Sequence, residues 1–439
     1  FPIIFWGSLK AGIVPVAVNT LLSTDVYDTI LRDSRAEVVF VSEELLPVIS
    51  PAIEGNPFIK KVFVIGDSPG DFLNFHDELA KCEEGVSIWV SADECAFWLY
   101  SSGSTGQPKG VRHVHSSMKY TADTYGAQVL GIQADDRVYS AAKFFFAYGL
   151  GNAMTFPMSV GATTILYSAR PTPDVVVSIL NEHKPSVFYG VPTLYAAMNA
   201  YLEAGSANLS VDLRRCISAG EALPEDVGKS WQEHSGCEIL DGVGSTEMLH
   251  IFLSNQSGNV IYGTSGIAVP GYRLRLVNES GLDVSVGEIG ELLVDGASAA
   301  SDYWNQRDKS RNTFEGVWTR TGDKYELRED GRYIYCGRTD DMFKVSGIWV
   351  SPFEVEQALM SHQRVLEAAV VPANDKDGLE KPMAYVILKD RASSDGLAES
   401  LKNHVQEKIG KWKYPRWIEF VDDLPKTATG KIQRFKLRN

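Results

Sequence analysis

The sequence is poor in the features of secreted, fibrous and nucleic-acid-binding proteins. Its 439 residues contain only five cysteines, an odd number without a C-x-x-C pair, which indicates free thiols in a reducing, cytoplasmic compartment. The 42 lysines and arginines are outnumbered by 56 aspartates and glutamates, and the net charge of −14 argues against nucleic acid as a partner. With 44% apolar and 22% charged residues, composition excludes collagen-like, coiled-coil and disordered chains. The length predicts more than one domain.

Long apolar runs without interruption are also missing. Residues 1–22 are apolar but contain Lys10 and two prolines, a pattern that does not fit a signal peptide. We expect a buried helix and strand there, from a protein whose true start is missing. The run Phe144–Leu166 has no charge, but Pro157 and several glycines interrupt it. We therefore predict a core helix followed by a strand, and no membrane partner.

The eight histidines are dispersed and form no metal-binding pattern. His113 and His115 are a close pair, but no cysteine or carboxylate partner completes a metal set. We expect both to lie on the face of a strand. Ser116 and Lys119 match S-x-x-K, but the other motifs of serine acylases are absent, and no G-x-S-x-G occurs.

Between residues 23 and 240, short β-branched runs alternate with amphipathic stretches opened by capping residues such as Thr24-Asp25 and Asp174. This alternation predicts parallel α/β sheets covered by helices. The expected strands are Val38–Val41, Val62–Ile65, Ala96–Tyr100, Thr163–Tyr167, Val187–Tyr189, Cys216–Ser218 and Glu238–Leu240. The expected helices are Val26–Arg32, Val175–Glu182, Pro192–Leu202 and Pro224–His234.

The pattern of expected helices and strands changes twice in the second half of the chain. Gly-rich hairpins from about residue 261 to 335, with strands such as Arg273–Val277 and Glu291–Val294, predict an antiparallel β subdomain. Then helices and strands expected at Pro352–Ser361, Glu367–Val371, Met383–Leu388 and Ser400–Ile409 predict a small α+β unit. We therefore predict an N-terminal domain of residues 1–337, a hinge at 338–342 and a mobile C-terminal domain of 343–439.

A Gly/Ser/Thr-rich segment, residues 100–110, directly follows the expected strand Ala96–Tyr100. Glycines let the backbone approach a ligand, and the segment adds hydroxyl donors and the charge of Lys109. This inventory suits a polyphosphate, although Pro108 and Gly110 exclude a Walker A loop. A flexible surface linker is the alternative.

Asp330-Gly331 is a strong signal for a two-residue hairpin turn. If these two residues are the central pair, Asp323 and Arg338 face each other at the open end of the hairpin. The carboxylate could accept hydrogen bonds from two vicinal hydroxyls, as on a ribose, with the arginine holding it in place. A plain cross-strand ion pair is the alternative.

Two further segments carry candidate chemistry. Residues 241–247 follow the expected strand Glu238–Leu240 as an acidic turn, in which Thr246 offers a hydroxyl for phosphate and Glu247 an oxygen for Mg²⁺. A turn with a solvated glutamate is the alternative. Residues 425–434 form a basic Thr/Gly loop that is either a solvated face or a carrier of a lysine to another site by domain movement.

Together these segments resemble the adenylate-forming superfamily of acyl-CoA ligases, adenylation domains and luciferases. The matching segments, in order over nearly the whole chain, are 100–111, 241–247, 321–323, 337–340 and 426–431. Within the superfamily the chain is most similar to benzoate-type aryl-CoA ligases, through residues 145–151, 189–193 and 244–251.

The resemblance implies a two-step reaction with ATP, Mg²⁺ and coenzyme A. An aromatic carboxylate would attack the α-phosphate of ATP, and the CoA thiol would then displace AMP from the acyl-adenylate. Benzoate, hydroxybenzoate and halobenzoate remain open as substrates, as does a homodimer. A carrier-loading adenylating enzyme and a non-catalytic nucleotide-binding module are the alternatives.

The resemblance also implies roles for individual residues. The phosphates would be cradled by Ser101, Ser102, Gly103, Ser104, Thr105, Gly106 and Lys109. Thr246 would touch the α-phosphate, Glu247 the metal, and Asp323 and Arg338 the ribose. Adenine would be bordered by Gly220, Glu221, Ala222, Asp241, Gly242, Val243 and Gly244, and Ser245 would also belong to the ATP site. The acyl pocket would be lined by Ala147, Tyr148, Gly149, Gly190, Val191, His250 and Ile251. Small residues beside an aromatic one would make it a flat slot, where Tyr148 or His250 could partner a ring hydroxyl.

The C-terminal part would supply the moving pieces. Asp340 would be the hinge, and Lys431 would bridge the substrate carboxylate and the α-phosphate during adenylation. Lys344, Ser346 and Gly347 would then replace Lys431 and line the pantetheine tunnel. Two departures matter: Val243 stands where many members have an aromatic residue, and the usual N-terminal segment is missing, which would leave part of a sheet open and apolar surface exposed.

Overall fold

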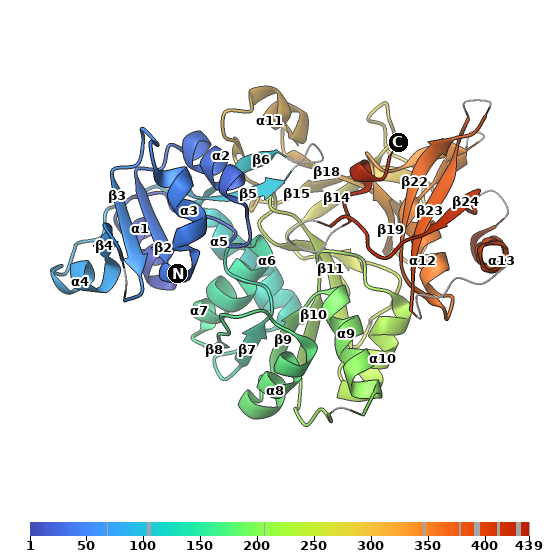
Figure 1. Ribbon diagram of the computed structural model, residues 1–439, viewed down its shortest axis with the longest axis horizontal. Helices are drawn as coiled ribbons and strands as arrows, with labels where there is room; N and C mark the ends of the chain where they lie inside the picture. The colour runs from blue at the N-terminus through green and yellow to red at the C-terminus, as the bar shows by residue number, and fades with distance from the viewer. Residues whose placement is uncertain are drawn as a thin grey trace.

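The computed structural model describes residues 1–67, 69–102, 107–205, 207–345, 348–376, 379–389, 396–410, 413–426 and 432–438. Within these residues the predicted α/β architecture is confirmed, with an antiparallel β subdomain and an α+β C-terminal part (Figure 1). Figure 1 shows the N-terminal elements at one end, the C-terminal elements at the other, and the helices α8–α10 against the sheet between them.

A central sheet, parallel over most of its width, organises the large region. Its order is β13 (Ile267–Ala268), β12 (Ile251–Ser254), β11 (Ile239–Gly244), β10 (Arg215–Ser218), β9 (Val187–Gly190), β7 (Arg137–Ser140) and β8 (Thr163–Ile165). The strands from β11 to β8 run parallel, while β12 and β13 are antiparallel to their neighbours. Tyr189 and Phe188, adjacent in β9, enter different core clusters because successive side chains point to opposite faces.

Helices cover both faces of this sheet, as expected for parallel strands. One face packs against α8 (Pro173–His183), α9 (Pro192–Glu203) and α10 (Glu225–Ser235). The other packs against α5 (His115–Thr121), the π-helical η2 (Ala122–Leu130), α6 (Ala147–Leu150), η3 (Gly151–Thr155) and α7 (Phe156–Val160). The core helix and strand predicted for Phe144–Leu166 are thus present as α6, η3, α7 and β8. Capping by Asp174 is wrong, because α8 already starts at Pro173, which has the fixed φ of a first helical position.

The N-terminal elements form two smaller sheets. One contains β1 (Val16–Ala17), β5 (Cys95–Ser102), β6 (Pro108–Val114) and β16 (Asp302–Tyr303); the other contains β2 (Val38–Ser42), β3 (Lys61–Ile65) and β4 (Leu73–Asn74). Their helices are α1 (Pro2–Lys10), α2 (Thr24–Ser34), η1 (Glu43–Leu45), α3 (Leu46–Ile53) and α4 (Phe75–Ala80). The helix and strand expected at the start are present, but α1 buries only Phe5 and Leu9. Likewise Thr24 lies inside α2 and does not cap it.

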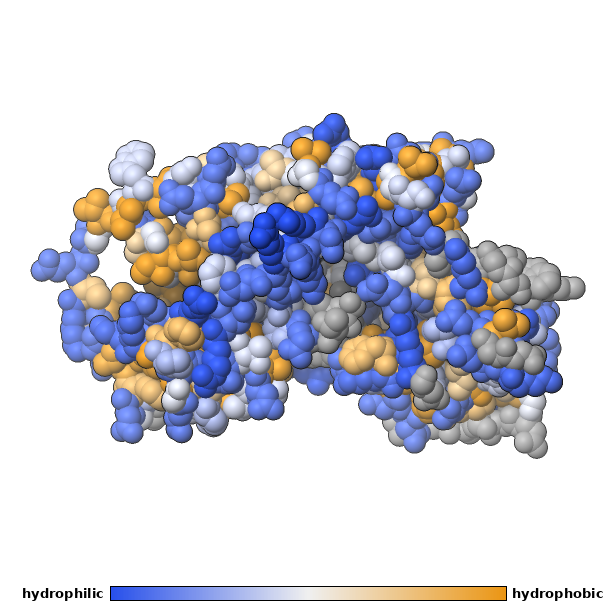
Figure 2. Space-filling view, turned by 90° about the horizontal axis from the view of Figure 1, so that it is seen from above, coloured by the Kyte–Doolittle hydropathy of each residue, from blue (hydrophilic) through white to orange (hydrophobic). Residues whose placement is uncertain are grey.

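The sheet of β2, β3 and β4 leaves one face only partly covered, since Phe75 of α4 packs against Phe40 there. Val39 and Val41 are buried against α2 and α3, whereas Val38 and Phe40 on the opposite face are 43% and 39% exposed. Figure 2 shows orange apolar surface at the end of the molecule that carries these N-terminal elements. Apolar side chains are therefore exposed at this sheet.

The antiparallel subdomain contains β14 (Arg273–Val277), β15 (Ile289–Asp295), β17 (Phe314–Glu315), β18 (Trp318–Leu327) and β19 (Tyr333–Arg338), with α11 (Arg307–Thr313) beside it. The β18–β19 turn is longer than the predicted two-residue turn. The backbone N–H of Arg328 donates to the carbonyl of Arg332, so residues 329–331 form the connection. Gly331 closes it with a φ of +82°, which glycine adopts without strain.

An extra residue in β19 corrects the register again. Lys324 pairs with Gly337 but Tyr325 with Tyr335, so one residue of β19 is left over between them. Asp323 therefore still faces Arg338, as predicted. The wrong turn length and the β-bulge cancel each other.

The C-terminal part has its own hydrophobic core. It contains β20 (Phe343–Val345), β21 (Ile348–Val350), α12 (Pro352–Met360), β22 (Val365–Asn374), β23 (Glu380–Leu388), α13 (Leu397–Ile409), β24 (Trp417–Phe420) and η4 (Arg434–Lys436). Buried side chains of α12, α13, β22 and β23 make up this core. Its mobility and the boundaries at residues 337 and 343 stay predictions.

The cysteines agree with the prediction of free thiols. All five cysteines are free thiols. In the described part of the chain, no helix combines the length and apolar character that a membrane crossing requires.

Candidate active site

Part of the segment expected to be a phosphate-binding loop is in strands. Ser101 of β5 pairs with Lys109 of β6, and Ser102 with Pro108. The loop prediction is wrong for these residues, because antiparallel pairing satisfies their backbone groups and extends both strands. Residues 103–106, predicted to wrap the phosphates, lie outside the described part of the chain, as does the side chain of Ser102.

Lys109 forms a charged cluster with Glu247 and Tyr303. Its Nζ lies 2.8 Å from Oε1 of Glu247 and 2.9 Å from the Tyr303 hydroxyl, which itself donates to Oε1 at 2.8 Å. Burial alone would raise the pKa of Glu247, but the Lys109 charge and the hydrogen bonds outweigh it and lower that pKa to about 2. Glu247 is therefore an ionised carboxylate whose side chain is only 15% exposed.

Beneath this cluster, buried His113 supports Thr246. Nε2 of His113 lies 2.8 Å from the Thr246 carbonyl oxygen, and since a carbonyl can only accept, Nε2 carries the proton. Burial lowers the pKa of His113 to about 4, so the ring is neutral. The strand-face prediction holds for His113 in β6 but is wrong for His115, the first residue of α5.

The acidic turn begins later than predicted. Residues 241–244 belong to β11, whose end pairs antiparallel with β12, so they are not part of a turn. A Cβ at Gly244 would lie 2.5 Å from the His250 carbonyl oxygen, and one at Gly242 would lie 2.9 Å from Cγ2 of Ile251. Both glycines are thus required by the close approach of the returning chain. Ser245 accepts a hydrogen bond from the Met248 N–H at 3.2 Å.

Residues 220–222, predicted to border adenine together with 241–244, follow the carboxyl end of β10. Ser218 of β10 is in register with Asp241 of the neighbouring parallel strand β11. The carboxyl ends of parallel strands share one edge of a sheet, so the two predicted adenine segments emerge side by side. Gly220 has a φ of +99°, which favours glycine there.

Asp241 is a buried acid at this edge. Burial raises its pKa to about 8, although backbone N–H groups of Leu223 and Gly242 partly oppose the rise. A carboxyl group with a raised pKa in the folded state loses its stabilising contribution as pH rises from about 4 to about 8. We therefore expect the Asp241→Asn variant to gain melting temperature relative to wild type progressively from pH 5 to pH 8, measured by thermal melts. Asp330→Asn in the exposed hairpin turn is the control, and a pH-independent difference for Asp241→Asn would contradict the assignment.

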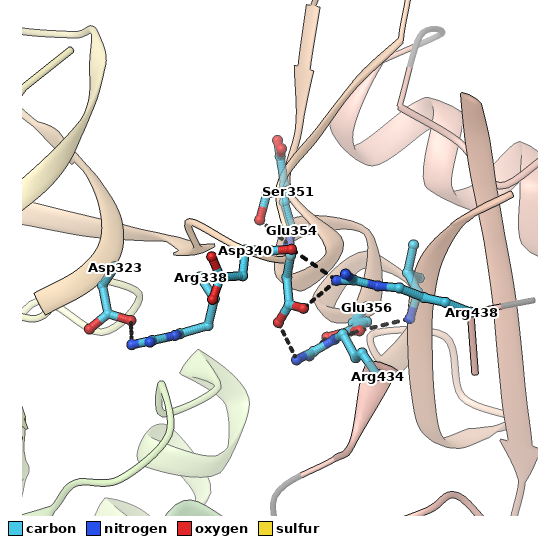
Figure 3. Close-up of polar contacts among 10 residues, drawn as sticks. Asp323, Arg338, Asp340, Ser351, Glu354, Glu356, Arg434 and Arg438 are labelled. Carbon is cyan, nitrogen blue, oxygen red and sulfur yellow. Dashed lines mark hydrogen bonds and ion pairs between the residues drawn. The ribbon is translucent and has the colours of Figure 1, made fainter. Parts of the chain in front are cut away.

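Asp323 and Arg338 form an ion pair at the open end of the β18–β19 hairpin (Figure 3). Nη1 of Arg338 donates to Oδ1 of Asp323 at 2.8 Å and to the Thr321 carbonyl at 3.0 Å. Gly322, between Thr321 and Asp323 in the sequence, has a φ of +69°, and a Cβ there would lie 2.9 Å from Nη2 of Arg338. The glycine therefore lets the guanidinium lie across the backbone beside the carboxylate.

Electrostatic interactions link these distant pieces. Besides burial, the negative charges of Asp323 and Asp241 both raise the pKa of Tyr325, so this buried ring lies near both carboxylates. The positive charge of Arg338 likewise acts on the hydroxyl of Tyr303, the partner of Glu247. The segments predicted for ribose and adenine are therefore both close enough to Tyr325 to act on it, and Arg338 is close enough to act on Tyr303.

The residues expected to line an acyl pocket come from α6, the end of β9, the residue before α9, the residue before β12 and the start of β12. The hydroxyl of Tyr148 donates to the carbonyls of Gly190 at 3.1 Å and Ile217 at 3.3 Å. Nε2 of His250 lies 3.0 Å from Oδ1 of Asn152 and 3.3 Å from the carbonyl of Tyr148. Burial lowers the pKa of His250 to about 3, so a neutral imidazole donates to these acceptors.

Packing explains two of the glycines in this set. A Cβ at Gly149 would lie 2.1 Å from the Lys143 carbonyl oxygen, and one at Gly190 would lie 2.7 Å from Cε2 of Tyr195. Their small size is therefore required by neighbouring protein atoms, whatever it contributes to a substrate slot. The pocket roles of Ala147, Val191 and the other members of the set stay predictions.

Arginines of the C-terminal tail anchor the segment expected to be the hinge (Figure 3). Arg434 donates to both carboxylate oxygens of Glu356 in α12, at 2.9 and 2.6 Å, and to Asp341 at 3.3 Å. Arg438 donates to Asp341 at 2.6 Å and to the carbonyl of Asp340 at 3.0 Å. Asp340 is exposed and lies between Arg338, which is tied to Asp323, and Asp341, which is tied to the tail.

The residues predicted for the pantetheine tunnel and for the tail cation lie only partly within the described chain. Ser346, Gly347 and Lys431 lie outside the described residues. Lys344 in β20 lies 3.4 Å from Oε1 of Glu279 in the antiparallel subdomain. The tunnel and the tail lysine therefore stay predictions.

Sequence reasoning missed Tyr303 and the role of His113. Tyr303 is separated by 194 residues from Lys109 and by 56 from Glu247. No spacing in one sequence marks such a contact. The one available signal was the position of the Tyr303 hydroxyl in the short strand β16, which pairs with the charged strand β6.

Comparisons with known proteins agree with these motifs. The family of AMP-binding enzymes matches residues 1–304, and the AMP-binding enzyme C-terminal domain matches 354–431. The 4-hydroxybenzoate–CoA/benzoate–CoA ligase of Rhodopseudomonas palustris is 56% identical, over 100% of this chain and 82% of its own. The benzoate–CoA ligase of Thauera aromatica is 53% identical, over 100% and 83%. A benzoate CoA ligase structure from Burkholderia xenovorans LB400 has a TM-score of 0.91 at 50% identity, over 100% of this chain and 87% of that one. The chain therefore belongs to the AMP-binding enzymes, the adenylate-forming superfamily that its motifs indicate.

Proposed function

We propose that this chain is an ATP-dependent ligase that converts a benzoate-like aromatic acid to its CoA thioester through an acyl-adenylate. The observation that carries the proposal is that a chain of this family contains both the Lys109–Glu247–Tyr303 cluster and the Asp323–Arg338 ion pair. A cation beside an ionised carboxylate suits a metal-bound triphosphate, and a fixed carboxylate at a hairpin end suits a ribose diol.

The reaction has two displacements. In the first, a carboxylate oxygen of the acid attacks the α-phosphorus of ATP, and the bond to the β-phosphate breaks to release pyrophosphate. In the second, the CoA sulfur attacks the acyl carbon, AMP leaves, and the thiol proton passes to solvent. Lys109 and Thr246 are proposed to hold the phosphates, and Asp323 and Arg338 to orient the nucleotide.

The residues present fit Mg²⁺ bound together with ATP. Mg²⁺ takes oxygen ligands and usually uses one or two carboxylates plus substrate phosphates. Within the described residues, no group of three or more His, Cys, Asp or Glu side chains offers an all-protein metal site. Glu247 is ionised and would supply one carboxylate oxygen. When bound, the ion would neutralise charge on the phosphates.

An aromatic acid is the substrate class that the acyl segment supports. Names of the similar proteins given above state benzoate or 4-hydroxybenzoate. Around His250, rings of Tyr125, Tyr148 and Phe156 lie with centroids 5.4, 5.7 and 4.5 Å away. Such an aromatic environment favours a flat ring over a long aliphatic chain.

Domain rotation about Asp340 is proposed to separate the two steps. Its neighbours are anchored on opposite sides, Arg338 to Asp323 and Asp341 to Arg434 and Arg438. A rotation would therefore be concentrated in the short stretch between them, bringing Lys431 for adenylation and Lys344, Ser346 and Gly347 for thioester formation.

Pyrophosphate release tests the proposal. With benzoate, ATP and Mg²⁺ the chain should release pyrophosphate, and addition of CoA should yield benzoyl-CoA and AMP. Thioester formation on an acyl-carrier protein but not on CoA would instead favour the carrier-loading alternative. Absence of pyrophosphate with a panel of benzoates would reject the ligase assignment.

The ribose contact predicts a selective effect on ATP. Asp323→Asn keeps the shape of the side chain but removes the charge that pairs with Arg338. Because hydrogen bonds to charged groups contribute about 1.5–3 kcal/mol, we expect KM for ATP to rise roughly 10- to 100-fold. KM for benzoate should change less than threefold. Asp295→Asn, which disturbs an exposed pair with Arg273, is the control. Equal changes in both KM values would contradict the ribose role.

A further inference from the structure

The loop between β11 and β12 is held by its backbone carbonyls. The carbonyl of Thr246 accepts a hydrogen bond from Nε2 of His113 at 2.8 Å. The carbonyl of Glu247 accepts from the N–H of Ala300 at 2.7 Å. The carbonyl of Met248 accepts from the hydroxyl of Ser298 at 2.8 Å. The three donors come from β6 and from the segment before β16, so two distant parts of the chain hold one loop.

The two side-chain donors are themselves fixed. His113 and Ser298 are both 0% exposed. The imidazole stacks on the Phe97 ring with centroids 5.2 Å apart and planes inclined by 19°. The Ser298 hydroxyl uses its one hydrogen to donate to the Met248 carbonyl, so the Tyr272 hydroxyl, 2.7 Å away, must donate to Ser298. Neither donor can turn away without breaking a second contact.

Backbone strain lies directly after these three residues. Leu249 has a φ of +67°, a left-handed conformation that costs a side-chain-bearing residue energy. Such a conformation persists only where the surroundings over-determine the backbone. Two sets of hydrogen bonds hold the backbone around Leu249 in this conformation. Before Leu249, the carbonyls of residues 246–248 are bound as described above; after it, the His250 N–H donates to the Met248 carbonyl at 2.8 Å.

The held peptide units carry the side chains proposed to meet phosphate and Mg²⁺. Movement of the Thr246 carbonyl would turn the Thr246 and Glu247 side chains with it, and a displacement near 1 Å can cost roughly a hundredfold in rate. We propose that His113, together with Ser298 on the same loop, is a positioning residue for adenylation that acts through the backbone of Thr246 and Glu247. This inference rests on the proposed ligase function.

A pair of variants with similar side-chain length tests the inference. His113→Gln keeps an N–H donor near the position of Nε2, whereas His113→Met has no donor. Pyrophosphate release is measured as a function of Mg²⁺, and benzoyl-CoA formation is measured separately from supplied benzoyl-adenylate. We expect His113→Met to lower adenylation about 10- to 30-fold and to raise the half-saturating Mg²⁺ at least fivefold, with thioester formation within threefold. His113→Gln should keep adenylation within threefold of wild type.

Each other outcome has a defined meaning. Equal adenylation by the Gln and Met variants, or equal losses in both half-reactions, would overturn the positioning role. If the Met variant does not fold, Ser298→Ala replaces it and should raise the half-saturating Mg²⁺ at least twofold; unchanged Mg²⁺ dependence would overturn the inference. Wild-type chain run in parallel separates this from the proposed function, because failure of wild type to release pyrophosphate rejects the ligase itself.

Discussion

Replacing Lys431 by alanine is expected to slow adenylation about a hundredfold or more, while thioester formation from supplied benzoyl-adenylate stays within threefold of wild type. Adenylation brings the benzoate carboxylate and the ATP α-phosphate together, so a cation between the two anions stabilises the transition state. Removing one such preorganised group typically costs about 3 kcal/mol, which corresponds to roughly a hundredfold in rate. Pyrophosphate release and benzoyl-CoA formation, measured separately, give the two rates.

Lys426 provides a matched control within the same basic segment. Its Nζ donates to Oε2 of Glu367 at 2.7 Å, so it is held on the C-terminal domain. Lys426→Ala should change both half-reactions less than threefold. If Lys431→Ala instead lowered both half-reactions equally, the lysine would not act in adenylation alone, and the proposed exchange between two domain orientations would be wrong.

Elements with strong local signals were predicted well from the sequence. β2, β3, β9 and β10 match β-branched runs, and α8–α10 match amphipathic stretches, because burial on a sheet or helix face imposes a period that one sequence displays. The Asp323–Arg338 pairing was also predicted, although through a turn of the wrong length. There a β-bulge restored the register, and no local rule reveals such a compensation.

Predictions failed where tertiary contacts decide the outcome. Asp241 and the following glycines read as a turn, yet β12 returns alongside and extends β11 through them. Gly149 and Gly190 were expected to leave space for a substrate; protein atoms also approach both closely, which is a second reason for glycine that the sequence did not show, and their pocket role stays a prediction. Tyr303 was missed because its partners are distant in sequence and are brought together only by the fold.

The Glu247→Gln variant should be the other severe one, with adenylation reduced about a hundredfold. Glutamine keeps the size of the side chain and can still accept from the Tyr303 hydroxyl, but it has no charge to pair with Lys109. It also offers Mg²⁺ a neutral oxygen, a weaker ligand than a carboxylate. We therefore expect the half-saturating Mg²⁺ for pyrophosphate release to rise along with the loss in rate, a pattern measured by titrating Mg²⁺ at saturating ATP and benzoate.

Stability against pH gives a second readout of the same carboxylate. The folded-state pKa of Glu247 is lowered from 4.5 to about 2, so its stabilising contribution is present above about pH 4.5 and is lost as pH falls toward 2. The melting-temperature deficit of Glu247→Gln should therefore shrink over that range. Glu225→Gln, which disturbs an exposed pair with Lys229, should show no effect on Mg²⁺ dependence. A Glu247→Gln enzyme with wild-type Mg²⁺ dependence would place the metal elsewhere, because the charge it lost would then have had no part in holding the ion.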